Sequence, residues 1–251
     1  MAKAGVVAAA VLAGVTGCGV FQPAAAPSGM EKQITAGERV GANTRANASR
    51  AGSGHVPELS SSRPVPGRDV TAIGDSVMSA SAMALADVLP GIYIDAKPDR
   101  EMPTGLAILR SLAASGQLRP VVVVGLGTNY IVTASQLQQV LQIIGPHRKL
   151  VLINTYVPDG WSKQVNATEA AFIQKHPNVV PADWYDTIKD RLDLLWPDQV
   201  HPQIPGTLVY ARLVDQAIQA TRGVTGSASA AQPAVADRAN ATPPPSPHAG
   251  N

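Results

Sequence analysis

The chain has 251 residues, the length of one ordinary domain with tails. It carries 20 Lys and Arg against 18 Asp and Glu, so it has no excess of positive charge with which to bind nucleic acid. Its single cysteine excludes a disulfide framework and a cysteine-rich zinc site. Nine of its ten aromatic residues fall between Tyr93 and Tyr210, which indicates where the folded part lies.

The N-terminus has a positively charged start and then 18 uncharged residues, Ala4 to Phe21. Three interpretations stay open: a cleaved secretory signal, a lipoprotein signal, or an uncleaved membrane anchor. The stretch Val15-Thr16-Gly17-Cys18 resembles the bacterial lipobox, which makes Cys18 the candidate for lipidation. Each interpretation places the rest of the chain outside the cytoplasm. We therefore expect residues 1–21 to direct export, and as a lipoprotein signal or anchor to tether the chain to the cell envelope.

Two segments have the composition of a disordered chain. Residues 22–69 are rich in Ala, Ser, Gly, Arg and Pro and show no sustained apolar period, so they cannot bury enough surface to offset their chain entropy. Residues 223–251 are Pro- and Ala-rich in the same way. The sequence therefore predicts a disordered linker, a folded domain at residues 70–222, and a disordered tail. That domain is nearly neutral, with 12 basic and 13 acidic residues.

Within the domain, short β-prone runs alternate with helix-like stretches. Continuously apolar, β-branched runs are typical of strands covered on both faces. The expected strands are Val70–Ile73, Ile92–Ile94, Val121–Val124, Leu150–Ile153 and Val179–Val180. The expected helices are one that ends at Leu89, Leu106–Ala114, Thr133–Ile144, Trp161–His176 and Thr207–Ala220. This alternation predicts an α/β fold, a three-layer α/β/α sandwich around a mostly parallel five-stranded sheet.

Three polar clusters lie where such a sheet places its active site, at the carboxyl ends of strands. They are Gly74-Asp75-Ser76 after the first strand, Gly127-Thr128-Asn129 after the third, and Asp198-Gln199-Val200-His201 before the last helix. Each alone would suit a turn or a helix cap. Together, in this order and each at a strand end, the three clusters are a specific signal of an active site. No His, Asp and Glu cluster has the spacing of metal ligands, so we expect no metal and no cofactor.

With these three blocks the chain resembles the SGNH/GDSL hydrolase superfamily. It resembles more closely the extracytoplasmic SGNH domains attached to bacterial acyltransferase-3 membrane proteins, which include peptidoglycan O-acetyltransferases. The stretches that carry this closer likeness are Ala72–Met78, Ile94–Lys97, Ala182–Tyr185 and Trp196–His201. The resemblance covers about residues 70–220 and implies the SGNH hydrolase fold for them.

The resemblance and the chemistry of these side chains imply a serine acyl-ester enzyme. Ser76 is expected to attack an ester carbonyl while His201 removes its proton. Asp198, three residues before His201, is expected to orient the imidazole, and Asp183 is an alternative partner. The Ser76 backbone N–H and the Asn129 amide would stabilise the oxyanion.

Supporting roles are expected for Gly74, Asp75 and Gly127, which shape the turns around the candidate nucleophile. One departure from the superfamily stands out. Many of its members have a glycine after the second strand that donates an oxyanion-hole N–H, whereas the stretch Asp95–Glu101 contains none. The second backbone donor is therefore unassigned.

We expect an exported O-acetyltransferase or acetylesterase that acts on cell-envelope glycan through an acyl-serine. The expected partners are an acylated or acceptor glycan and, for a transferase, a separate membrane acyltransferase. Water and a sugar hydroxyl can both accept the acyl group from one triad, so the residues leave hydrolysis and transfer open. Two alternatives stay open as well: a general SGNH/GDSL esterase or lipase of small acyl esters, and a non-catalytic glycan-binding or accessory partner of a membrane acyltransferase.

Overall fold

The structure, a computed structural model, describes residues 28–50, 63–158 and 160–223. The expected export segment with Cys18, part of the expected linker and nearly all of the expected tail lie outside the described residues. Within the described part, no helix combines the length and the apolar character that a membrane span requires.

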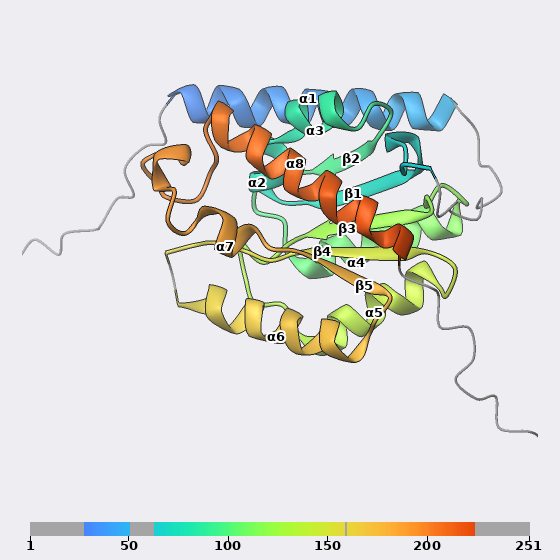
Figure 1. Cartoon of the computed structure of the whole chain (residues 1–251). Coiled ribbons are helices and arrows are strands. Elements are labelled where there is room, and N and C mark those ends of the chain that lie inside the picture. Colours follow the sequence, from blue (N-terminus) through green and yellow to red (C-terminus); the bar gives the residue numbers. More distant parts are fainter. Residues whose placement is uncertain (1–27, 51–62, 159, 224–251) are drawn as a thin grey trace, which may run out of the picture.

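Five parallel strands form the centre of the domain, in the order β2-β1-β3-β4-β5 (Figure 1). They are β1 (Val70–Gly74), β2 (Tyr93–Ala96), β3 (Val121–Gly125), β4 (Lys149–Ile153) and β5 (Val179–Ala182). The chain leaves β1 towards β2 on one side and returns to β3 on the other. The carboxyl ends of β1 and β3 therefore flank the switch point at which open α/β sheets bind ligands.

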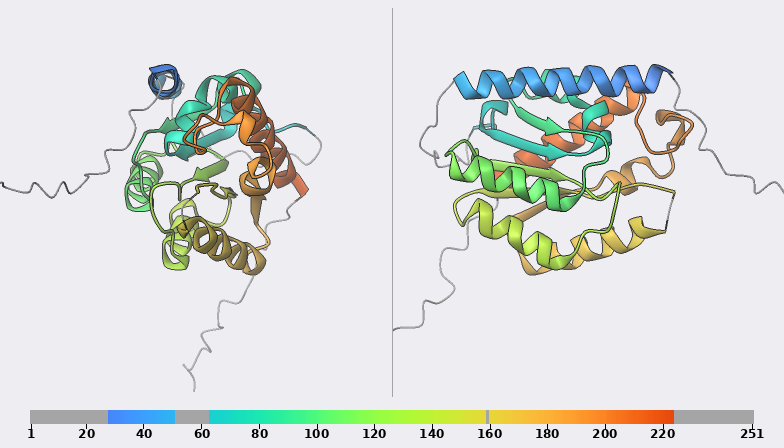
Figure 2. Two further views of the ribbon diagram at one scale, coloured as in Figure 1. Left: turned by 90° about the vertical axis from the view of Figure 1, so that its left-hand side faces the viewer. Right: turned by 180° about the vertical axis from the view of Figure 1, so that it is seen from behind.

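Helices cover both faces of this sheet, as Figure 2 shows end-on and from behind. One face packs against α2 (Ser76–Ala80), α3 (Ala82–Val88), α7 (Trp184–Ile188) and α8 (Ile204–Ala220). The other packs against α4 (Met102–Ala114), α5 (Ala134–Ile144) and α6 (Trp161–Lys175). Alternate residues of β3 enter the two cores, Val121 and Val123 one and Val122 and Val124 the other. The predicted three-layer sandwich is confirmed, and its sheet is entirely parallel.

The expected elements agree with the structure to within a few residues at their ends. Two details differ. The first helix-like stretch is interrupted at Ser81 and forms α2 and α3. The short helix α7 was not expected; Asp183 caps it by accepting a hydrogen bond from Asp186 N at 3.0 Å.

Residues 28–50 form the helix α1 (Ser28–Arg50), so the prediction of a disordered linker is wrong for them. The buried side of this helix has few apolar side chains, and its contacts depend on glycine. A Cβ added at Gly37 would lie 1.7 Å from the Ser79 carbonyl oxygen, which means that the two backbones touch. A Cβ added at Gly41 would lie 3.2 Å from the Ile94 carbonyl oxygen, a tight but less severe contact. A helix that docks through close backbone approach has no apolar periodicity in its sequence, which is why α1 was not expected.

The end of the expected linker is also ordered. Val65 is buried and exchanges two hydrogen bonds with the side chain of Gln219 in α8, with lengths of 2.8 and 3.1 Å. The amide of Gln219 pairs with this backbone as a strand would. The linker prediction is therefore wrong for this segment too.

The helix α1 covers the outer edge of the sheet along β2. An edge strand exposes backbone groups that need partners. Thr44 Oγ1 accepts a hydrogen bond from Ile94 N at 3.1 Å, and Arg45 donates one to Ile94 O at 3.0 Å. Arg45 also lies 3.7 Å from the Asp95 carboxylate. Side chains of a helix thus take the place of a neighbouring strand.

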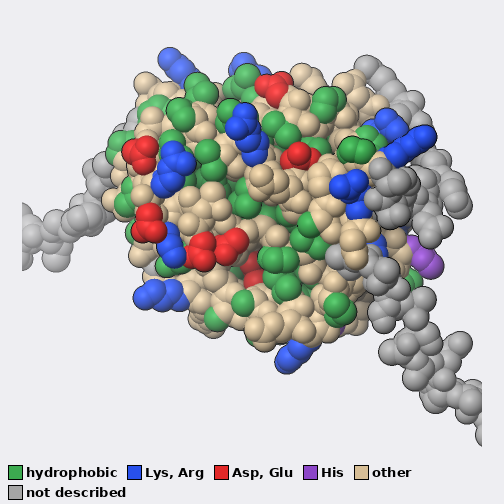
Figure 3. Space-filling view, in the orientation of Figure 1, with side chains coloured by type: hydrophobic (Ala, Val, Ile, Leu, Met, Phe, Trp, Pro, Cys, Tyr) green, Lys and Arg blue, Asp and Glu red, His purple; other side chains and the backbone are tan. Residues whose placement is uncertain are grey.

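The surface seen in Figure 3 carries basic and acidic side chains interspersed with apolar ones. No single stripe of positive charge runs across this face. The distribution agrees with the near balance of charges in the sequence.

We expect Gly37→Ala to destabilise the domain although alanine favours helix formation. The propensity gain is about 1 kcal/mol, while forcing an atom into a packed contact costs about 1–3 kcal/mol. A contact of 1.7 Å with a backbone oxygen belongs at the upper end of that cost, so the free energy of unfolding, measured by urea denaturation, should fall by about 2 kcal/mol. Asn43→Ala, on the exposed side of α1, serves as the control. A Gly37→Ala domain as stable as the wild type would contradict the close contact.

Candidate active site

The pairing of β1 with β3 brings the first two sequence blocks together. Gly74 lies opposite Gly125, and Asp75 N extends the pairing by donating to Gly125 O at 3.2 Å. Ser76 follows at once as the first residue of α2 and is 6% exposed. The sharp turn requires glycine at residue 74, because a Cβ there would lie 2.5 Å from the side chain of Met78.

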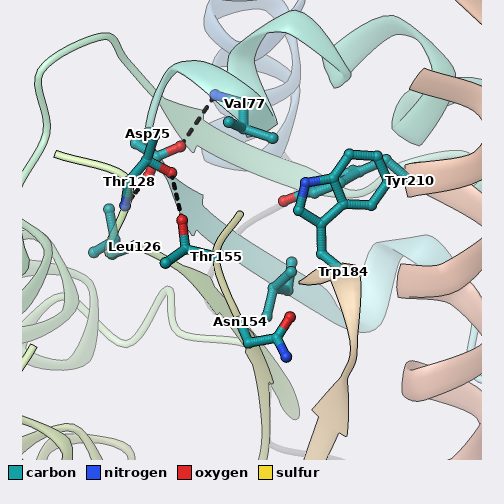
Figure 4. Close-up of a pocket in the computed structure, with 10 residues that line it drawn as sticks. Asp75, Val77, Leu126, Thr128, Asn154, Thr155, Trp184 and Tyr210 are labelled. Atoms are coloured by element: carbon teal, nitrogen blue, oxygen red, sulfur yellow. Dashed lines mark hydrogen bonds between the residues drawn. The ribbon is translucent and has the colours of Figure 1, made fainter. Parts of the chain in front are cut away.

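Asp75 joins the two blocks through its buried carboxylate (Figure 4). Its Oδ1 accepts from Val77 N at 3.0 Å and caps α2, while Oδ2 accepts from Thr128 N at 3.4 Å. Burial raises the pKa of Asp75 to about 6, although hydrogen bonds from Thr128 and Val77 favour the ionised form. The carboxylate shapes the backbone around Ser76, as the sequence suggested.

A small cavity lies beside Asp75, beneath the carboxyl edge of the sheet (Figure 4). Its volume is about 10 Å³, close to the smallest space that holds one water molecule. The Trp184 ring meets the Tyr210 ring edge-on, with centroids 5.1 Å apart. Trp184 Nε1 is buried and has no hydrogen-bond partner among the described residues. Burial and the nearby Asp75 charge raise the pKa of Tyr210 well above its ordinary value.

The second block turns sharply at Gly127, whose φ of +136° lies in the region that favours glycine. A Cβ there would also lie 2.8 Å from Val165 Cγ1. The Gly127 carbonyl accepts a hydrogen bond from Trp161 Nε1 at 3.3 Å. Asn129 follows, and its Nδ2 donates to the Arg100 carbonyl at 3.2 Å. An amide nitrogen has two hydrogens, so this bond leaves Asn129 a second one for an oxyanion.

Arg100 organises the loop that lacks the superfamily glycine. Its buried guanidinium donates to the Asp95 carboxylate at 2.7 Å, to the Asp95 carbonyl, and to the Gly74 carbonyl at 3.2 Å. Lys97 N also donates to the Gly74 carbonyl, at 3.2 Å. The backbone N–H of Lys97 is therefore directed to the end of β1. Arg100 was not expected from the sequence, where its one signal is a basic residue five positions after Asp95.

The third block supplies a paired carboxylate and imidazole. Asp198 Oδ2 lies 2.6 Å from His201 Nδ1, and its Oδ1 accepts from Val200 N and His201 N at 3.0 and 3.1 Å. Burial alone would raise the pKa of Asp198, but the hydrogen bonds from His201 and from the two backbone N–H groups outweigh it, so the pKa lies below its ordinary value. The other candidate partner, Asp183, instead accepts from Asn154 Nδ2 at 2.7 Å.

His201 Nε2 is buried and has no hydrogen-bond partner in the described part of the chain. The direct bond between Ser76 and His201 is therefore not formed here. In enzymes without substrate, such bonds are often long and tighten when substrate binds. Among the described residues, no group of three or more His, Cys, Asp or Glu could hold a metal ion.

Known proteins resemble this chain in part of its sequence and in its fold. No family model matches the sequence. Over 143 residues the chain is 31% identical to the peptidoglycan O-acetyltransferase OatA of Listeria monocytogenes, a match that covers 57% of this chain and 23% of that protein. The chain spans about a quarter of the length of the curated relatives it matches.

Two solved structures resemble the domain. The C-terminal catalytic domain of peptidoglycan O-acetyltransferase A from Streptococcus pneumoniae has a TM-score of 0.57 at 22% identity, with 64% of this chain and 97% of that chain covered. A lipolytic G-D-S-L family protein from Veillonella parvula has a TM-score of 0.50 at 14% identity, with 59% and 96% covered.

The three-layer sandwich with its carboxyl-edge blocks is therefore the SGNH/GDSL hydrolase fold. Within that class, the sequence is similar to peptidoglycan O-acetyltransferases. The resemblance drawn from the sequence blocks, including the closer likeness to these transferases, is confirmed.

We expect Gly127→Ala to destabilise the domain and to displace Asn129. A side chain at this φ costs about 1–3 kcal/mol, and the methyl group would also collide with Val165. Urea denaturation should show a loss of that size. Gly160→Ala is the control, because φ there is −64° and no atom lies within 4 Å of the added Cβ. Equal effects of the two substitutions would contradict the proposed strain.

The raised pKa of Asp75 makes stability depend on pH in a defined window. The folded chain holds a proton on Asp75 up to about pH 6, whereas the unfolded chain releases it near the ordinary value of 3.8. The folded state thus binds more protons between these values, and its free energy of unfolding falls as the pH rises through them.

We expect the stability difference between wild type and Asp75→Asn to shift by about 2–3 kcal/mol, to the disadvantage of the wild type, from pH 4 to pH 6.5. The asparagine carries no charge and loses this dependence. Denaturation series at several pH values test it, and groups that titrate in both chains cancel in the difference. A constant difference would show that the Asp75 pKa is not raised.

Proposed function

We propose that the chain is an exported serine acyl-ester enzyme that transfers acetyl groups to a cell-envelope glycan. Its triad would be Ser76, His201 and Asp198. The 2.6 Å contact between Asp198 Oδ2 and His201 Nδ1, at the edge of the sheet where Ser76 begins α2, is the observation that carries the proposal. Similarity to a protein named peptidoglycan O-acetyltransferase supports the choice of acceptor.

In the first half of the reaction, Ser76 Oγ attacks the carbonyl carbon of an acyl ester. His201 Nε2 takes the serine proton, and Asp198 stabilises the imidazolium that forms. The C–O bond to the donor alcohol then breaks, and its oxygen leaves with the proton from His201. An acetyl group remains bonded to Ser76.

The oxyanion of each tetrahedral intermediate needs fixed donors. The Ser76 backbone N–H and the second Asn129 amide hydrogen are the proposed ones. Asn129 is held by its bond to the Arg100 carbonyl, and Arg100 in turn is bonded to Asp95 and Gly74. Such preorganisation matters, because losing one oxyanion donor typically costs about 100- to 1000-fold in rate.

In the second half, an acceptor hydroxyl gives its proton to His201 and its oxygen attacks the acetyl carbon. The bond to Ser76 breaks, and Ser76 Oγ regains its proton from His201. A sugar hydroxyl as acceptor gives an O-acetylated glycan, and water gives acetate. We propose that residues 1–21 deliver the domain outside the cytoplasm, where such an acceptor lies, and that a separate membrane protein supplies acetyl groups.

The test follows p-nitrophenyl acetate turnover by the full chain, with and without chito- or muro-oligosaccharides. Ser76→Ala and His201→Ala should each lower turnover by about 1000-fold or more. Mass spectrometry should detect acetylated oligosaccharide with the wild type and with the control variants, but not with Ser76→Ala or His201→Ala. Ser111→Ala and His147→Ala, both at exposed positions, are the matched controls.

Triad-dependent release of acetate with no acetylated sugar would replace transfer by hydrolysis. A folded wild-type chain without turnover would favour the non-catalytic, glycan-binding alternative. Unchanged turnover in Ser76→Ala would remove Ser76 as the nucleophile.

A further inference from the structure

The helix α1 bonds to both segments that carry the candidate triad, through one side chain. Gln33 Nε2 donates to the Pro202 carbonyl at 2.8 Å and to the Ala80 carbonyl at 3.2 Å. Gln33 Oε1 accepts from Trp196 Nε1 at 3.3 Å. Both amide hydrogens are thus engaged, which fixes the orientation of the group.

The two carbonyls belong to the segments that carry Ser76 and His201, the residues between which the proton must pass. Ala80 ends α2, one helical turn after Ser76 at its start. Pro202 follows His201 directly, in a loop closed by the bond from Trp196 N to the His201 carbonyl at 2.8 Å. The amide of Gln33 therefore connects the helix of Ser76 to the loop of His201.

The surrounding contacts hold Gln33 in this position. Ser79 Oγ donates to the Ile34 carbonyl at 3.3 Å, next to the backbone contact of Gly37 with Ser79. At the other side, a Cβ added at Gly29 would lie 2.8 Å from the Trp196 ring. One end of α1 is thus packed against both α2 and the His201 loop, as Figure 1 shows in outline.

The distance between Ser76 and His201 must be set by contacts such as those of Gln33. His201 Nε2 has no partner among the described residues, so no direct bond sets its distance from Ser76. Proton transfer depends steeply on that distance, and a displacement of about 1 Å can cost about 100-fold in rate. A side chain that bonds to both segments can supply the constraint.

We propose that Gln33 is a positioning residue that sets the spacing between Ser76 and His201, an inference that rests on the proposed function. It makes α1 part of the catalytic unit, although α1 contributes no reacting group. Its expected signature is a loss in kcat with substrate binding retained.

The test uses the full chain with Gln33→Met, which keeps the length of the side chain and removes all three bonds. Active sites are counted by titration with a fluorophosphonate, so that unfolded molecules do not contribute. We expect kcat per titrated site on p-nitrophenyl acetate to fall about 10- to 100-fold, with KM changed less than about twofold. The rate constant for fluorophosphonate reaction with Ser76 should fall in parallel.

Gln33→Glu provides a second variant of equal size. It keeps the acceptor for Trp196 Nε1 but loses both donations, so its kcat should fall as well. Thr35→Met, on the exposed side of α1, makes the same kind of change away from the contact and should leave kcat unchanged.

The outcomes separate the two proposals. A wild-type chain without Ser76-dependent turnover would overturn the proposed function and this inference with it. An active wild type whose Gln33→Met or Gln33→Glu variant keeps kcat per site within about twofold would overturn this inference alone. A rise in KM at constant kcat would also overturn it, because Gln33 would then act on binding.

Discussion

The pairing of β1 with β3 is the constraint on which the rest of the site depends. It sets Gly74 opposite Gly125, and the extra bond from Asp75 N to Gly125 O extends the register past the end of the strand. The start of α2 and the turn at Gly127 consequently lie side by side, although about fifty residues separate them in the chain. Each of these two turns contains a glycine, Gly74 or Gly127. A side chain at Gly74 would collide with Met78, and one at Gly127 would collide with Val165.

Buried polar groups then hold the neighbouring loops to this pair of strands. The carboxylate of Asp75 binds the backbone of Val77 and Thr128, and the guanidinium of Arg100 binds Asp95 and the Gly74 carbonyl. The Asp95 carboxylate offsets the lost solvation of the Arg100 guanidinium, whereas the hydrogen bonds to Asp75 offset its burial only in part and its pKa stays raised. Each of these two groups connects segments from different strands and so holds the base of the site together.

Much of the architecture could be predicted from the sequence, because the strands are continuous β-branched runs and the helices have apolar faces. The three polar blocks could be located because parallel strands carry their sites at one edge. The helix α1 could not be predicted, because its contacts use Gly37, Gly41 and the polar side chain of Gln33 rather than an apolar stripe. The contacts of Arg100 and the cavity beside Asp75 also depend on residues far apart in the chain, which no local pattern encodes.

The same limit applies to how the site residues are held. The sequence favoured Asp198, three residues before His201, over Asp183 as the partner of the imidazole, and in the structure Asp198 Oδ2 lies 2.6 Å from His201 Nδ1. Asp183 is used locally, to cap α7 and bind Asn154. The sequence gives no sign of the bonds from Asn154 and Asp186 that hold Asp183, because they depend on how β4 and α7 meet.

The cover that α1 provides over β2 has a consequence for the molecule among its neighbours. Without Thr44 and Arg45, the Ile94 N–H and C=O would lie free on an exposed strand. Such an edge can pair with the sheet of another molecule and begin aggregation. A helix cannot extend a sheet, so α1 closes this edge to strand addition. The helix α1 therefore removes the route by which two copies of the chain could join their sheets through β2.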